Sequence, residues 1–154
     1  MKVFISYSTQ DLDIVRLFAK QLQHFAEVKY WAENKVLGKE SWDTIFSWID
    51  SSDIVLVLIT DNTVARAMSV GQEVGRAKAQ NKYIIPIVTS TVPSSELGFL
   101  SGTTYQAIDP FNPIPAVLEI TKALEKRSIE KKQNQNAALV LAILAIFIFI
   151  VSGK

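Results

Sequence analysis

The apolar residues of the chain follow two kinds of spacing. Short runs rich in β-branched and aromatic residues predict strands at residues 3–7, 28–31, 54–59, 83–88 and 105–108. Between them, apolar positions with a period near 3.6 predict helices over residues 11–25, 42–49, 63–80 and 113–125. Strands that alternate with helices favour right-handed crossovers and a parallel sheet. The pattern therefore predicts an α/β fold, a flavodoxin-like five-stranded parallel sheet with helices on both faces.

Two details of this pattern bear on the sheet and on its site. Residues 54–59 are continuously apolar, which is typical of a strand that is buried on both faces. Pro86 lies inside the next run and has no N–H group, which predicts a bulge or a sheet edge at this position. Ligand sites in such sheets lie at the carboxyl ends of the strands. The candidate loops are therefore residues 6–10, 32–41, 60–63 and 89–102.

The longest apolar run lies outside this pattern. Residues 137–151 read AALVLAILAIFIFIV, without a polar residue, and would extend about 22 Å as a helix. A bilayer core needs about 20 apolar residues, so we expect a short single-pass membrane helix over residues 137–152. A buried or oligomer-forming helix is the alternative. Before the run, residues 126–136 predict a basic and polar linker, in which residues 133–136 (QNQN) form a hinge. The positive-inside bias then places the domain, residues 1–125, in the cytoplasm.

Composition excludes several kinds of site. The chain has 154 residues, of which 49% are hydrophobic and 20% charged, with a formal net charge of +1. That balance gives no signal for a nucleic-acid partner. There is no cysteine and one histidine, His24, which excludes disulfides, zinc–thiolate sites, multi-histidine metal sites and a thiol nucleophile. We expect no metal ion, and His24 as a surface residue at the end of a helix.

Motifs narrow the function classes further. No GxGxxG follows the first predicted strand and no GxxxxGK[ST] occurs, so neither a Rossmann fingerprint nor a P-loop is present. A phosphate-accepting receiver domain needs acidic residues clustered at strand ends. Here the first strand ends in Ser6-Tyr7-Ser8, and Asp61 has no acidic neighbour on its strand. A receiver domain is therefore disfavoured.

Five segments, in order, carry a family resemblance. They are KVFISYS followed by Asp11, a loop with Gly38-Lys39, SDIVLVL at 52–58, SVGQEV at 69–74 and YIIPIV at 83–88. Together they resemble TIR (Toll/interleukin-1 receptor) domains, particularly bacterial ones, over roughly residues 1–125. The loop resembles the BB loop of that family, and SVGQEV resembles the segment that carries the catalytic glutamate of NAD-cleaving members. Those members often have a tryptophan shortly before the glutamate, where this chain reads Ser69-Val70-Gly71-Gln72.

The resemblance implies an NAD+ glycohydrolase or cyclase that cleaves the nicotinamide–ribose bond, with NAD+ as its substrate and no further cofactor. It implies a homo-oligomer formed through TIR–TIR contacts and a role in bacterial antiphage defence or signalling at the membrane. The implied site consists of Glu73 as the catalytic carboxylate, with Ser8, Thr9, Glu33, Lys39 and Trp42 binding the nucleotide. The alternative is a non-catalytic TIR adaptor that acts by assembly.

Each of these residues also has a structural interpretation. Glu73 is spaced to pair with Arg76 one helical turn later, and Ser8, Thr9 or Asp11 can cap the first helix. Gly71 and Gly75 serve either helix–sheet packing or the close approach of a ligand or strand. Glu33 is otherwise a solvated loop charge, and Trp42 on a short helix is otherwise a core residue. The structure has to separate these interpretations.

Overall fold

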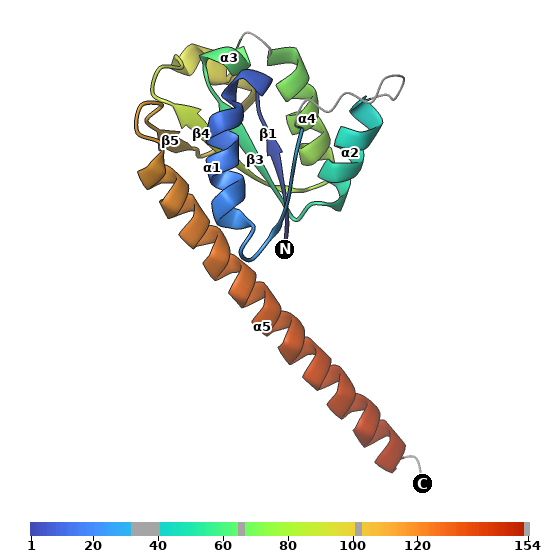
Figure 1. Ribbon diagram of the computed structural model, residues 1–154. Coiled ribbons are helices and arrows are strands. Elements are labelled where there is room, and N and C mark those ends of the chain that lie inside the picture. Colours follow the sequence, from blue (N-terminus) through green and yellow to red (C-terminus); the bar gives the residue numbers. More distant parts are fainter. Residues whose placement is uncertain (32–40, 65–66, 101–102, 153–154) are drawn as a thin grey trace.

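The computed structural model describes residues 1–31, 41–64, 67–100 and 103–152, with residues 140–152 described by their backbone alone. A parallel sheet of five strands, in the order β2-β1-β3-β4-β5, forms its centre (Figure 1). The strands are β1 (Lys2–Ser6), β2 (Glu27–Tyr30), β3 (Ile54–Ile59), β4 (Tyr83–Thr89) and β5 (Gln106–Ile108). All the pairings between them are parallel. The predicted α/β, flavodoxin-like fold is therefore confirmed.

Helices cover both faces of the sheet. On one face lie α1 (Leu12–Leu22) and the first part of α5 (Ile114–Ser152), and on the other lie α2 (Ser41–Ser51) and α4 (Ala67–Ala79). Three short elements connect the layers, namely η1 (Thr9–Asp11), α3 (Asp61–Val64) and η2 (Ser94–Leu100). The helix predicted over residues 63–80 is thus two helices, α3 and α4.

Each strand in the middle of the sheet supplies side chains to two cores. Along β1, Val3 and Ile5 pack with α1 and α5, whereas Phe4 packs with α2 and α4. All six residues of β3 are buried, as its unbroken apolar run predicts. Each fully buried Ile, Leu or Phe side chain contributes about 1.5–3 kcal/mol relative to exposure. These side chains hold the sheet between its two helical layers.

Pro86 lies inside β4, opposite Val57 of β3, in a pairing that runs without a bulge. Pairing between β4 and β5 begins one residue later, at Ile87. The sheet therefore has a local edge on the β5 side of Pro86, so the missing N–H group interrupts no described ladder. The edge expected from the sequence is present, and the bulge is not.

Helix α5 continues without a break through residues 126–136, so the hinge expected in that linker was wrong. The stretch contains neither glycine nor proline, and nothing in its sequence ends a helix. Figure 1 shows α5 running down past the end of the sheet and out of the domain. Among the residues whose placement is described, no helix is both long enough and apolar enough to cross a membrane.

Candidate active site at the carboxyl edge of the sheet

Two neighbouring strands bring their polar loops together. Strands β1 and β3 pair in parallel, with Ser6 of β1 opposite Val57 of β3. The loop after β1 therefore lies beside the loop after β3, at the carboxyl edge of the sheet, where ligand sites of this fold occur.

Asp11 joins these two loops. Its carboxylate accepts a hydrogen bond of 2.7 Å from the Thr60 hydroxyl and another of 2.7 Å from the Asn62 amide. Asp11 as a whole is 9% exposed. The helix-capping role expected for Asp11 was wrong, because its side chain makes no capping hydrogen bond at the start of α1. Sequence reasoning missed this contact, although Thr60 and Asn62 follow a neighbouring strand in the predicted sheet.

The hydroxyl groups of Ser6 and Ser8 lie in the same region of the fold. Both residues are buried, with exposed fractions of 1% and 0%. Neither Oγ atom has a hydrogen-bond partner in the described part of the chain, and a buried hydroxyl without a partner costs about 1–3 kcal/mol. Ser8 precedes η1 without capping it through its side chain, so its capping role was wrong. The two buried hydroxyls thus keep hydrogen-bonding capacity that no described residue uses.

Thr9, the other residue predicted in this loop, is half-buried in the first position of η1. It follows Ser8 directly, so both residues predicted after β1 lie at the carboxyl edge. Their contact with a nucleotide stays a prediction.

Glu73 occupies the buried side of α4. It is 8% exposed, and it shares its helix face with Val70 and Ala77, three positions before and four positions after it, which are also buried. Val70 and Val74 pack in the cluster that contains Phe4 of β1 and Val57 of β3. The carboxylate is therefore drawn in toward the sheet rather than extended into solvent.

Arg76 does not hold Glu73 at the surface. Its guanidinium forms a bidentate pair with the Asp50 carboxylate of α2. Nε donates to Oδ1 at 2.8 Å, and Nη2 donates to Oδ2 at 2.5 Å. The hydrogen bonds from Arg76 hold the pKa of Asp50 below its usual value. Arg76 also lies over the Phe46 ring, 5.6 Å from its centre. The predicted Glu73–Arg76 pair was wrong, because the Arg76 guanidinium binds Asp50 instead.

Gly71 and Gly75 leave open space beside α4. A Cβ atom added to either glycine would meet no described atom within 4 Å. The helix–sheet packing expected for them was therefore wrong, as was the approach of a neighbouring strand. The approach of a ligand stays a prediction.

Aromatic residues lie at the end of β2 and on α2. The Tyr7 hydroxyl donates a hydrogen bond to the Trp31 carbonyl, and the rings of Trp31 and Trp48 lie 5.8 Å apart. The half-buried Trp42 ring lies 5.5 Å from that of Phe46 in the same helix. Trp42 thus packs against an aromatic side chain of its own helix, and its contact with a ligand stays a prediction.

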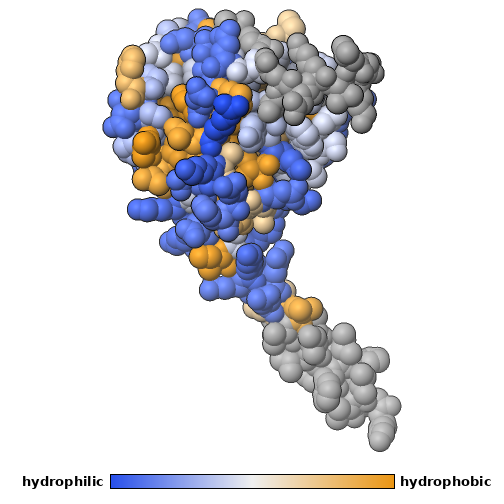
Figure 2. Space-filling model, viewed as in Figure 1, coloured by the Kyte–Doolittle hydropathy of each residue, from blue (hydrophilic) through white to orange (hydrophobic). Residues whose placement is uncertain are grey.

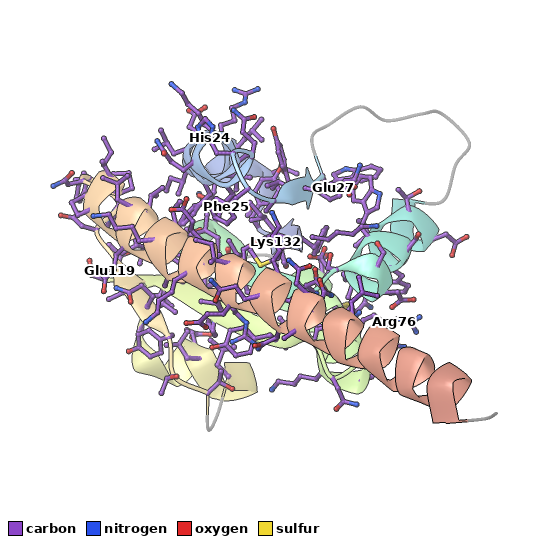
Figure 3. All side chains as sticks on the ribbon, turned by 90° about the horizontal axis from the view of Figure 1, so that it is seen from below. His24, Phe25, Glu27, Arg76, Glu119 and Lys132 are labelled. Atoms are coloured by element: carbon purple, nitrogen blue, oxygen red, sulfur yellow. The ribbon has the colours of Figure 1, made fainter. Side chains whose placement is uncertain are left out.

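Two predicted site residues, Glu33 and Lys39, lie outside the described residues. His24 is exposed after the end of α1, as expected (Figure 3). In the part of the chain that the structure describes, no three His, Asp or Glu side chains are grouped to hold a metal ion.

Comparisons with known proteins agree on the fold. The family model described as TIR domain matches residues 3–116. The TIR domains of the activated Roq1 resistosome, which directly recognises the pathogen effector XopQ, are similar with a TM-score of 0.63 and 12% identity, over 80% of this chain and 98% of that chain. Clostridium botulinum CMP N-glycosidase BcmB is similar with a TM-score of 0.55 and 14% identity, over 78% and 98%. No curated protein matches the chain in sequence.

Proposed function

Because the chain belongs to the TIR domain family, we propose that it cleaves the nicotinamide–ribose bond of NAD+, with Glu73 as the catalytic carboxylate. The observation that carries this proposal is the burial of Glu73 on the sheet side of α4 while Arg76 binds Asp50. A carboxylate kept from solvent acts strongly on charge that develops beside it, because little water screens the interaction.

The chemistry suits a site that consists of a carboxylate and hydroxyl groups. Nicotinamide leaves NAD+ as a neutral molecule, because the pyridinium nitrogen takes the electron pair of the broken C–N bond. The ribose carbon then develops oxocarbenium character, as in glycoside cleavage. Glu73 would hold the ribose hydroxyls and stabilise this positive charge. Attack by water gives ADP-ribose, and attack by a nucleophile within the ADP-ribose unit gives a cyclic product.

Two further observations support this assignment. Ser6 and Ser8 keep buried hydroxyls whose hydrogen-bonding capacity is unused within the described part of the chain, and such groups suit ribose or phosphate oxygens. One protein of similar fold is named a CMP N-glycosidase, and this name means that it cleaves the N-glycosidic bond of a nucleotide. We assign Ser8, Thr9, Glu33, Lys39 and Trp42 to nucleotide binding on the family resemblance.

The setting of the activity is part of the same proposal. We propose a homo-oligomer formed through TIR–TIR contacts and a role in bacterial antiphage defence or signalling. The apolar residues 137–152 would tether the domain to a membrane as a single-pass helix, with the domain in the cytoplasm. The sequence of that run and the basic residues before it support the tether.

The direct test is incubation of the purified full chain with NAD+, with chromatography of the products. The assay is run in dilute solution, with a crowding agent and on vesicles, because assembly is expected to complete the site. Release of nicotinamide supports the proposal, and the second product distinguishes hydrolysis from cyclisation. If no condition releases nicotinamide, the catalytic proposal is wrong, and the result favours the alternative of a non-catalytic adaptor.

A further inference from the structure

Helix α5 is held against the amino edge of the sheet by a set of contacts. The Arg127 guanidinium lies 4.0 Å from the centre of the Tyr83 ring, at the first residue of β4. The Lys131 ammonium pairs with the Asp53 carboxylate at 2.6 Å. Ser128, between these two cations, is buried. The contacts fix the direction of α5 relative to the sheet as far as Lys131, and the helix then leads out of the domain (Figure 1).

A group of cations surrounds α5 where it leaves the domain. We call this group the basic collar, and it consists of Lys2, Lys126, Arg127, Lys131 and Lys132. On the face that Figure 2 shows, hydrophilic residues gather where α5 leaves the domain, next to small apolar patches. Figure 3 places Lys132 on the part of α5 that passes below the sheet.

The charge of the basic collar is only partly neutralised. The Lys131 ammonium pairs with the Asp53 carboxylate, and the Lys2 ammonium lies 4.0 Å from the nearer carboxylate oxygen of Glu27. Lys126 and Lys132 are exposed, and neither has an ion-pair partner among the described residues.

An open hollow lies within the basic collar. It has a volume of about 340 Å³, and its lining includes Lys2, Lys131 and Lys132. Asp53 also lines it, but the carboxylate is already bound by Lys131 and by the backbone N–H of Lys2. The hollow thus offers positive charge to an anion that enters from solvent.

Distance along α5 separates the collar from the other cations of the helix. Lys132 precedes Ala137, the first residue of the apolar run, by about 8 Å of helix. That distance is about the Debye length at physiological ionic strength. Lys122 lies about 22 Å of helix before Ala137, so salt screens its charge from a surface at Ala137. Lys131 and Lys132 would therefore act at any surface that the apolar run enters, whereas Arg127 and Lys126 lie about 15–17 Å from Ala137 and are more strongly screened.

We propose that the basic collar binds the phosphate groups of anionic phospholipids. The inference rests on the membrane tether of the proposed function and adds a lipid preference and an orientation to it. The unneutralised cations, the hollow and the apolar run that follows them on the same helix all favour this occupant. Bound in this way, the amino edge of the sheet faces the membrane, and the candidate site at the carboxyl edge faces the cytoplasm.

Competition between two kinds of vesicle isolates the contribution of charge. The full chain, released from detergent, is offered phosphatidylcholine vesicles and vesicles that also contain phosphatidylglycerol, one of them carrying a biotinylated lipid for separation. The apolar run contributes equally to both, so the partition ratio measures the collar. We expect a ratio in favour of the anionic vesicles that falls as salt shortens the Debye length.

Two matched variants locate the effect. Lys132→Gln should lower the ratio about fivefold, because a cation near the surface contributes about 1 kcal/mol. Lys122→Gln removes the same charge from the same helix and should leave the ratio unchanged. A ratio of one for the wild type, or equal losses in both variants, overturns the inference alone. A chain that stays with neither kind of vesicle overturns the tether and the inference together.

Discussion

At the scale of single residues, Asp11 has the most specific structural role outside the proposed chemistry. It accepts hydrogen bonds from Thr60 and Asn62 and so fastens the loop after β1 to the loop after β3. Asp11→Ala leaves the Thr60 and Asn62 donors without this acceptor, at about 1–3 kcal/mol for each group that stays buried. We expect a loss of that size in the free energy of unfolding, measured by urea denaturation.

A nearby aspartate provides the control for this prediction. Asp13 lies two positions further on, its side chain is 97% exposed, and its contact with Arg16 is 3.5 Å long. Asp13→Ala should change the free energy of unfolding by less than about 1 kcal/mol. Similar losses in the two variants would contradict the structural role of Asp11.

Residue-level prediction from the sequence succeeded where a pattern is local and failed where a partner is distant. The exposure of His24 follows from its position after an amphipathic helix. Arg76 is spaced to reach Glu73, yet it binds Asp50, which comes from a different helix packed alongside. Asp11 was likewise interpreted from its local position, as a helix cap. Its actual hydrogen-bond donors, Thr60 and Asn62, follow a neighbouring strand and are distant in the sequence. Local spacing does not contain these tertiary contacts.

At the scale of elements, the strands were predicted to within about one residue, because buried strands leave unbroken apolar runs. The central strand, β3, matches its prediction at both ends. The helix over residues 63–80 was predicted as one because both pieces are polar enough to suit a single surface helix. The continuity of α5 was missed because Gln and Asn in residues 133–136 were interpreted as a hinge, although neither breaks a helix as proline does.

The contact between α5 and the sheet should make stability depend on pH. Partial burial raises the pKa of Asp53, but hydrogen bonds from Lys131 and the Lys2 N–H outweigh it and leave the pKa below 3.8. A lowered folded-state pKa contributes stability above the unfolded value, and this stability is lost as the pH falls through the folded value. Asp53→Asn should therefore be less stable than the wild type near neutral pH, by less than about 1 kcal/mol.

Melting curves recorded over a pH series check this prediction. The difference between the wild type and Asp53→Asn should shrink as the pH falls below 3.8. Glu125→Gln, at an exposed position of α5, serves as the control and should follow the wild type throughout. A difference that stays constant down to the acid limit would mean that the Asp53 charge contributes nothing to the attachment of α5.

At the scale of the whole molecule, α5 connects the domain to the apolar run as one continuous helix. We expect the full chain to sediment with membranes when it is expressed in bacteria, and a chain that lacks residues 137–154 to remain in the supernatant. Extraction by detergent but not by high salt would distinguish burial in lipid from surface charge. Full-length chain in the supernatant without detergent would contradict the tether.

The measurement that tests the central claim most directly compares the full chain with Glu73→Gln in one NAD+ cleavage assay. Glutamine keeps the volume of the side chain and removes the charge that would stabilise the oxocarbenium-like transition state. We expect nicotinamide release to fall about 10²–10³-fold, with the melting temperature within about 4 °C of the wild type. Glu119→Gln, at an exposed position on α5, should release nicotinamide at the wild-type rate. Undiminished release by a folded Glu73→Gln chain would show that Glu73 is not the catalytic carboxylate.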